Sequence, residues 1–238
     1  MLTVGVSSLD EYAALLAARA DEAETLAERL AIKVSRFYRN AVTFDLLRHQ
    51  VVPMLAEAAG GGPVRVWCAG CGCGEEAYTL AMLLDEGGIA CTIDATDIDR
   101  AALASAGRAV YGAAALGELP RDLAQRYLEP LSLEGVVRYR VRDVLRERVR
   151  VTWHDITAAR LAGSDTFAMV SCRNVLIYLQ PPAQRRALQH LCARLGAGST
   201  LVLGEAEWPA AGLEPALRVV GARARVFMAA SDPSGAET

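Results

Sequence analysis

The sequence predicts an α/β protein whose main domain is a largely parallel β-sheet with crossover helices and a closing hairpin. Three observations support this class. After residue 63, apolar runs of strand length alternate with helical patterns, which is typical of parallel strands joined by helices. A glycine-rich loop joins the first predicted strand to the next helix. The last apolar stretch is typical of two strands that turn at Gly221.

The length and composition are those of one globular domain with a small appendage. The chain has 238 residues, of which 53% are hydrophobic and 22% are charged. Charged residues interrupt every apolar stretch before it reaches the roughly 18 residues that a membrane span needs. Asp10 and Glu11 stand where an export signal would be basic and then apolar. We therefore expect a cytoplasmic protein that does not insert into membranes.

Charge and cysteine content argue against nucleic-acid binding, disulfide bonds and a metal site. The net charge of −3 creates no field that would attract nucleic acid, so nucleic acid is not an expected partner. The charge is unevenly distributed, however, with six arginines between residues 138 and 150. Three of the six cysteines lie in predicted buried strands, and no disulfide is expected. Cys68, Cys71 and Cys73 lack the second ligand pair of a zinc site, and no metal is predicted.

The N-terminal part is predicted to be helical. Apolar positions recur at helical spacing over the first 35 residues, and Ser8–Glu11 matches a capping box. A second helix is expected at about 21–30. A third apolar stretch, 44–55, is expected to break at Pro53.

A glycine run at 60–62 predicts the domain boundary. We expect an N-terminal helical unit at 1–60 and a main domain at 61–238. The predicted strands of the main domain are Val64–Cys68, Cys91–Thr96, Val149–His154, Phe167–Cys172 and Thr200–Gly204. Its predicted helices are Glu75–Leu84, Arg100–Arg108 and Pro182–Leu195, and the hairpin covers 216–229.

The first predicted strand leads into a loop that contains Gly70, Gly72 and Gly74. Without a Cβ atom, these residues let the backbone pass close to a ligand, so the loop is predicted to bind a nucleoside-containing cofactor. The spacing also suits a dinucleotide enzyme, and a plain tight turn is a further alternative.

The second predicted strand ends in Asp97-Ile98-Asp99. A carboxylate about 20 residues beyond such glycines can accept hydrogen bonds from both ribose hydroxyls. We therefore predict that Asp97 binds ribose and that Asp99 is the N-cap of the following helix.

The fourth predicted strand is followed by Arg173 and Asn174 and then by an apolar segment with one tyrosine, Tyr178. Polar side chains just beyond a strand end usually face the ligand crevice in this architecture. The alternative is structural, with Arg173 as a surface cation and Tyr178 as a ring of the core.

In combination, these motifs resemble those of the chemotaxis receptor methyltransferases of the CheR type. That family transfers a methyl group from S-adenosylmethionine (SAM) to glutamate side chains of methyl-accepting receptors. The likeness extends from about Leu9 to Phe227. The motifs that carry it are SRFYR at 35–39, the loop at 67–78, ATDID at 95–99, HDI at 154–156, CRNVLIY at 172–178 and GEAE at 204–207.

The resemblance implies a class I SAM-dependent methyltransferase fold, with a Rossmann-like sheet, a short N-terminal helical unit and a small inserted β-subdomain at 111–148. It implies SAM as cofactor and S-adenosyl-L-homocysteine as product. The implied cofactor-binding residues are Ser35, Arg39, Gly70, Gly72, Gly74, Glu75, Glu76, Asp97, Asp155, Ile156, Arg173 and Asn174. The implied catalytic residues are Tyr178, Arg173 and Asn174, with Tyr178 beside the transferred methyl group.

The implied substrate is a chemoreceptor-like protein with an acidic helical methylation region. Arg138, Arg140 and Arg142 alternate in the sequence, so on a strand they would share one face. Such a face suits an acidic peptide, and a solvated strand edge protected by charge is the alternative. The chain departs from the family pattern at Glu205, where the family has histidine, and in its acidic N-terminal unit.

Other functions stay open at this point. One alternative is a SAM methyltransferase that acts on RNA or a small molecule, and another is a non-catalytic, regulatory SAM-binding module. A dinucleotide dehydrogenase is less favoured, because the segment from Cys172 to Tyr178 has no role in such an enzyme.

Overall fold

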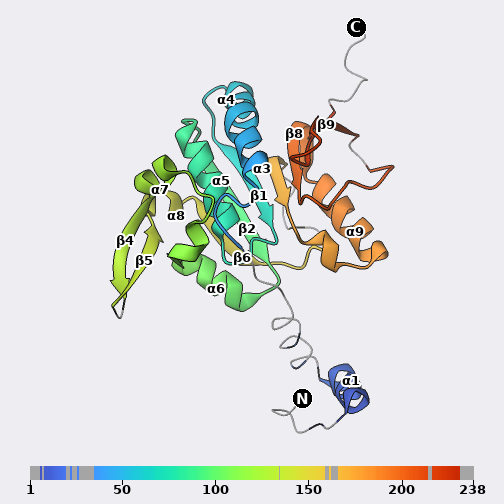
Figure 1. Ribbon diagram of the computed structural model, residues 1–238. Helices are drawn as coiled ribbons and strands as arrows, with labels where there is room; N and C mark the ends of the chain where they lie inside the picture. Colours follow the sequence, from blue (N-terminus) through green and yellow to red (C-terminus); the bar gives the residue numbers. More distant parts are fainter. Residues whose placement is uncertain are drawn as a thin grey trace. The chain divides into compact units, whose positions relative to one another are not determined.

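The computed structural model describes residues 6, 8–19, 22, 26, 35–133, 135–158, 161, 166–213 and 216–230 (Figure 1). The chain divides into two compact units, Met1–Val34 and Ser35–Thr238. Helix α1 (Leu9–Ala18) belongs to the first unit. Its N-cap is Ser8, whose side chain accepts a hydrogen bond from the Glu11 N–H at 3.1 Å, as the capping pattern predicts. The helix predicted at about 21–30 lies almost wholly outside the described residues.

The second unit begins with one continuous helical segment made of α3 (Ala41–Leu46), a π-helical turn η2 (Leu47–Val51) and α4 (Val52–Ala59). The predicted break at Pro53 is wrong. Pro53 lies in the first turn of α4, where an α-helix does not need the N–H that proline lacks. The compact unit that contains the sheet begins at Ser35.

The main sheet has seven strands in the order β6-β2-β1-β7-β8-β10-β9 (Figure 1). Strands β6, β2, β1, β7 and β8 are parallel to one another, β10 is antiparallel to β8, and β9 is antiparallel to β10, which confirms the predicted crossovers and hairpin. Strand β8 begins earlier than predicted. The strands are β1 (Val64–Ala69), β2 (Cys91–Asp97), β6 (Val149–Trp153), β7 (Phe167–Cys172), β8 (Leu195–Leu203), β9 (Leu217–Gly221) and β10 (Val226–Ala229).

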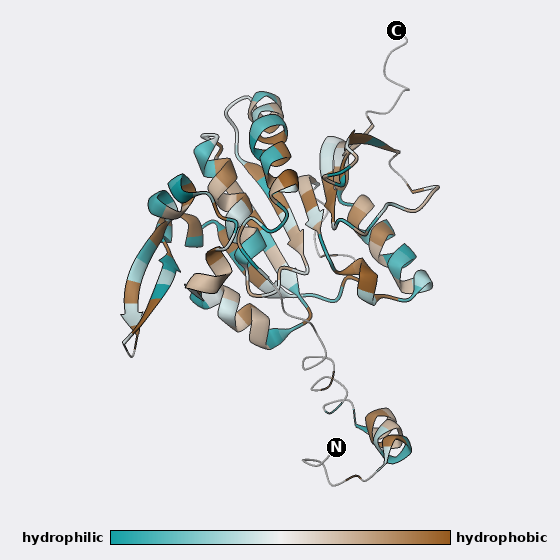
Figure 2. Cartoon of the chain, in the orientation of Figure 1, coloured by the Kyte–Doolittle hydropathy of each residue, from teal (hydrophilic) through white to brown (hydrophobic). Residues whose placement is uncertain are grey.

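The predicted helices are present as α5 (Glu75–Glu86), α6 (Arg100–Arg108) and α9 (Pro181–Cys192). Hydrophobic residues fill two core clusters on the two faces of the sheet. Val66 and Cys68 of β1 join the cluster that includes α5, whereas Trp67 and Ala69 join the one that includes α9. In Figure 2 the central strands are mainly hydrophobic, whereas α4 and α9 mix hydrophobic and hydrophilic residues.

Among the helices of the described residues, none combines the length and the apolar character that crossing a membrane requires.

The segment between β2 and β6 contains the small subdomain. Its three strands form an antiparallel sheet in the order β3-β5-β4. Arg138 and Arg140 lie on β5, but the strand ends before Arg142, which is the N-cap of a short helix, so the three arginines do not share one strand face as predicted. The elements are β3 (Val110–Gly112), η3 (Ala113–Leu116), α7 (Arg121–Tyr127), β4 (Leu128–Leu133), β5 (Val136–Val141) and α8 (Asp143–Arg146).

Candidate active site

Several of the predicted site residues lie at the carboxyl ends of three adjacent parallel strands. Strand β1 leads into the glycine loop, β2 ends at Asp97, and β7 is followed by Arg173 and Asn174. Because β2, β1 and β7 are neighbours in the sheet, their carboxyl ends lie side by side. The structure therefore brings together motifs that are about 100 residues apart in the sequence.

The glycine loop has the backbone conformation that favours glycine. Gly70, Gly72 and Gly74 have φ angles of 73°, 54° and 94°. A Cβ atom on Gly70 would lie 2.2 Å from Cγ2 of Val175, whereas one on Gly72 would meet nothing within 4 Å. Packing thus requires glycine at position 70, while the backbone at Gly72 faces open space.

Asp97 is held in place by backbone donors. One carboxylate oxygen accepts the Gly72 N–H at 2.8 Å, and the other accepts the Asp99 N–H at 2.9 Å. Each carboxylate oxygen can accept a further hydrogen bond. The Asp99 side chain accepts from Ala101 and Ala102 at the start of α6, which confirms the predicted N-cap.

The segment predicted to flank adenine begins beside the same strand end. The N–H of His154 donates to the carbonyl of Asp97 at 3.0 Å. One oxygen of the Asp155 carboxylate accepts from the N–H and the hydroxyl of Thr157 at 2.8 and 2.7 Å. Ile156 is buried. Asp155 and Ile156 therefore adjoin the strand end that carries Asp97.

Glu75 is a buried acid in the first turn of α5, with 5% of its surface exposed. Ser35 makes a side-chain hydrogen bond to it, but Oε2 of Glu75 has no hydrogen-bond partner among the described residues. Burial raises the pKa of the Glu75 carboxyl, and the hydrogen bond from Ser35 opposes this increase. A buried acceptor without a donor marks a place where a cationic or hydrogen-bond-donating group would be stabilised.

We expect Glu75→Gln to stabilise the protein in the absence of cofactor. Because the pKa of Glu75 is higher in the folded than in the unfolded chain, ionisation of Glu75 lowers stability as the pH rises between the two values. The variant should be more stable than the parent near pH 7, because glutamine keeps the shape of the side chain without the buried charge. Urea unfolding at neutral and at acidic pH measures this. The gain should vanish below both pKa values, and a loss of stability at neutral pH would contradict the prediction.

Glu76 and Arg173 form a buried ion pair. Nη1 of Arg173 lies 3.0 Å from Oε2 of Glu76, and the two side chains are 2% and 17% exposed. The hydroxyl of Ser171 donates to the other oxygen of Glu76 at 2.5 Å. The alternative of a surface cation is therefore wrong for Arg173.

Arg173 also binds the segment that precedes α3. Its Nη2 donates to the carbonyl of Arg39 at 2.8 Å and to Oδ1 of Asn40 at 3.0 Å. Asn40, which the motifs do not predict, has a φ of 68° and donates from Nδ2 to Oε2 of Glu205 at 2.9 Å. Its position directly after the SRFYR motif, together with the tolerance of asparagine for positive φ, is the signal that could have indicated it.

The turn after Arg173 presents a tyrosine to solvent. Asn174 has a φ of 58°, and the 3₁₀ turn η4 (Leu176–Tyr178) follows. The side chain of Tyr178 is 61% exposed, so the alternative of a core ring is wrong. The N–H of Asn174 donates to the buried carboxylate of Glu207 at 3.0 Å. This turn places a phenolic hydroxyl at the carboxyl edge of the sheet.

Two cysteines near the glycine loop, Cys68 and Cys71, are buried. Burial raises the pKa of the Cys68 and Cys71 thiols, which keeps them protonated at neutral pH. In the part of the chain that the structure describes, no group of three or more His, Cys, Asp or Glu residues is arranged to hold a metal ion.

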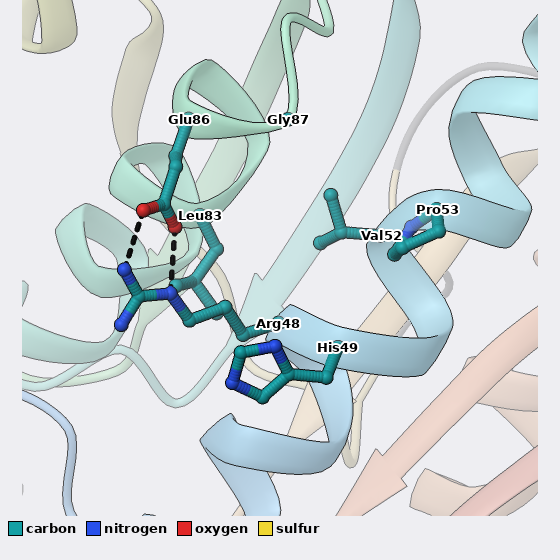
Figure 3. Close-up of a pocket in the computed structure, with 7 residues that line it drawn as sticks. All are labelled: Arg48, His49, Val52, Pro53, Leu83, Glu86 and Gly87. Carbon is teal, nitrogen blue, oxygen red and sulfur yellow. Dashed lines mark hydrogen bonds and ion pairs between the residues drawn. The ribbon is translucent and has the colours of Figure 1, made fainter.

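A cavity of about 450 Å³ lies away from these residues. It is found near the C-terminal end of α5, whereas Glu75 begins that helix, and twelve residues of helix span about 18 Å. Figure 3 shows Arg48 of η2 bonded to Glu86 of α5 at this cavity. Its lining residues are Arg48, His49, Val52, Pro53, Leu83, Glu86 and Gly87. None of them is a predicted site residue.

The chain is similar to known proteins over a range that includes these residues. Residues 33–224 match the family model described as CheR methyltransferase, SAM binding domain. The chain is 33% identical over 210 residues to the probable biofilm formation methyltransferase WspC of Pseudomonas putida, covering 87% of this chain and 49% of that protein. It is 30% identical over 215 residues to chemotaxis protein methyltransferase 1 of Pseudomonas aeruginosa, covering 85% of this chain and 76% of that protein. This chain thus spans about half the length of WspC.

A solved structure that is similar to this chain is CalS10, an amino pentose methyltransferase from Micromonospora echinaspora with bound SAM. The identity is 21% and the TM-score is 0.38, and the match covers 72% of this chain and 56% of that chain.

The match to the family includes the glycine loop, Asp97, Arg173, Asn174 and Glu207. The seven-stranded sheet, with five parallel strands and a closing hairpin, is the class I methyltransferase arrangement that the sequence predicts. The family model covers well over half of the chain. The chain therefore belongs to the CheR methyltransferase family and contains its SAM-binding, class I methyltransferase domain.

Proposed function

We propose that this domain transfers the methyl group of SAM to glutamate side chains of a chemoreceptor-like protein in the cytoplasm, forming glutamate methyl esters. The observation that carries the proposal is the exposed Tyr178 within a segment, 172–179, that contains neither lysine nor histidine. Such a site suits an acceptor that is already ionised. Several relatives at about 30% identity are named chemotaxis protein methyltransferases, which supports the same substrate class.

The residues at the sheet edge fit the cofactor. Asp97 would accept the ribose hydroxyls, and the unsatisfied Oε2 of Glu75 would accept a donor from the cationic amino group. The open backbone at Gly72 would allow close approach of the ligand. When bound, the cofactor supplies an electrophilic methyl group on a sulfonium whose leaving group is already activated. The other residues assigned to its binding are Ser35, Arg39, Gly70, Gly74, Glu76, Asp155, Ile156, Arg173 and Asn174.

In this proposal, the protein aligns and desolvates the acceptor rather than deprotonating it. A glutamate side chain is ionised near neutral pH, because its pKa is about 4.3. The Tyr178 hydroxyl would donate a hydrogen bond to one oxygen of the acceptor carboxylate and so orient the acceptor for transfer. Asn174 lies at the start of the same turn. Arg173 organises the site through Glu76 and the backbone of Arg39.

The proposed partner is an acidic helical segment of the receptor. The small subdomain carries a basic strand, in which Arg138 is exposed and Arg140 pairs with Glu129. Arg138 therefore offers a positive charge to an acidic peptide.

Labelled SAM tests the acceptor class. We expect the protein to label a chemoreceptor cytoplasmic fragment with a methyl group that mild alkali releases as methanol, because esters hydrolyse while N-methyl groups and 2′-O-methyl ethers persist. An Asp97→Ala variant serves as the control for cofactor-dependent labelling. Stable label on RNA, on a protein amine or on a small molecule would favour the rival methyltransferase. Binding of SAM without turnover on any receptor fragment would favour a regulatory module.

A further inference from the structure

The carboxylate of Glu207 is buried, at 3% exposure, beneath the turn that carries Tyr178. Its Oε1 accepts three consecutive backbone N–H groups, from Val175 at 2.9 Å, Leu176 at 2.8 Å and Ile177 at 3.3 Å. N–H groups at the start of a helical turn lack partners within the turn. A side chain from a distant part of the sequence thus caps η4.

The second oxygen of the same carboxylate fixes the residue that starts the turn. Oε2 of Glu207 accepts the Asn174 N–H at 3.0 Å and the Gly204 N–H at 2.6 Å. A Cβ atom on Gly204 would lie 2.5 Å from this oxygen and 2.6 Å from the Asn174 nitrogen. Glycine at position 204 is therefore required for the carboxylate to reach Asn174, which has a positive φ of 58°.

The carbonyl side of the turn is held by a different residue. Nε2 of Gln184, on α9, donates to the carbonyls of Leu176 at 2.9 Å and Leu179 at 3.0 Å. Tyr178 itself is 61% exposed, so the packing of its ring contributes little to its position. The position of the phenol therefore depends on the backbone of the turn.

We propose that Glu207 is a positioning residue for methyl transfer, which fixes Asn174 and the Tyr178 turn without touching the substrate. The proposal rests on the proposed function, in which Tyr178 meets the acceptor. Five N–H donors converge on two oxygens, which only an ionised carboxylate satisfies, because the amide of a glutamine would direct an NH₂ group at some of them. The charge of the carboxylate strengthens each of these hydrogen bonds.

Glu207→Gln tests the proposal with two measurements. Hydrogen exchange should become faster at the amides of residues 174–177. The kcat for methyl transfer should fall about ten- to hundredfold, because small misplacements of reacting groups have effects of this size. The dissociation constant for SAM, measured by calorimetry, should rise by a smaller factor than kcat falls, because Asn174 is only one of the residues assigned to the cofactor, whereas the whole turn carries Tyr178. Gln184→Leu, which loosens the turn from its carbonyl side, should lower kcat in the same direction.

Asp85→Asn is the matched control for a general loss of stability. Asp85 is a partly buried carboxylate that accepts the Tyr127 hydroxyl at 2.7 Å and pairs with Arg148 at 2.7 Å, away from the site. This variant should unfold more easily and keep the parent kcat and the parent exchange at 174–177. An equal loss of kcat in both carboxylate variants, or unchanged exchange at 174–177 in Glu207→Gln, would overturn the proposal.

The two proposals fail in different ways. If the parent protein labels an acceptor with an alkali-stable methyl group, the proposed substrate class is wrong, and the kcat comparison is made with that acceptor. If the parent forms alkali-labile esters and Glu207→Gln keeps its kcat, the positioning role is wrong and the substrate class stands.

Discussion

Replacing Arg173 with methionine should lower the free energy of unfolding by about 3 to 5 kcal/mol. The side chain is 2% exposed and its partner, Glu76, is 17% exposed, so the variant leaves a carboxylate in the interior without its cation. Such a loss is a large part of the roughly 5 to 15 kcal/mol that stabilises a typical domain. Urea unfolding followed by circular dichroism measures the change.

Two further variants separate the buried pair from a general effect of removing arginine. Arg126 is 60% exposed, and Arg126→Met should cost less than about 1 kcal/mol. The double variant Arg173→Met/Glu76→Gln should recover part of the loss, because it removes the uncompensated charge. Equal losses in Arg173→Met and Arg126→Met would show that the buried pair has no special role in stability.

Arg173 stabilises the fold and also contacts residues of the candidate site. Its guanidinium links β7 to α5 through Glu76, and it holds the carbonyl of Arg39 and the side chain of Asn40. The segment that contains Ser35 and Arg39 is therefore anchored by the same residue that follows the central strand. A loss of this anchor should also displace Ser35 and Arg39, which are proposed to bind the cofactor.

The sheet could be predicted because its signal is local. Strands buried on both faces form continuous apolar runs, as in Phe167–Cys172, and helices between them keep a regular spacing. The predictions that were wrong concern places where packing between elements, rather than local sequence, determines where a helix or strand ends. Pro53 falls in the first turn of α4, directly after a π-helical turn, and the strand that carries Arg138 and Arg140 ends one residue before Arg142.

The site was predictable where one motif contains both partners. The Asp99 N-cap follows from its place before α6. The hydrogen bonds of Glu207 to the turn at 174–177 could not be derived, because they join segments about 30 residues apart that only the fold brings together. Asn40 is a similar case, since its side chain bridges Arg173 and Glu205.

Tyr178→Phe should lower kcat for methyl transfer about ten- to hundredfold while SAM affinity stays close to that of the parent. The ring remains, and the variant loses only the hydroxyl that is proposed to orient the acceptor carboxylate. Because the side chain is 61% exposed, its hydroxyl contributes little to folding, and the free energy of unfolding should change by less than about 0.5 kcal/mol. Steady-state kinetics with a receptor fragment and calorimetry with SAM measure the two quantities.

Tyr127→Phe gives the opposite pattern and serves as the control. The Tyr127 side chain is 2% exposed and its hydroxyl donates to Asp85 at 2.7 Å, far along α5 from the candidate site. Removing that hydroxyl should cost about 1 to 2 kcal/mol of stability and leave kcat unchanged. If Tyr178→Phe instead behaves like Tyr127→Phe, losing stability and keeping its turnover, then Tyr178 is a structural residue. The acceptor would in that case be oriented by another group, for which Asn174 and Gln180 are the polar side chains near Tyr178 in the sequence.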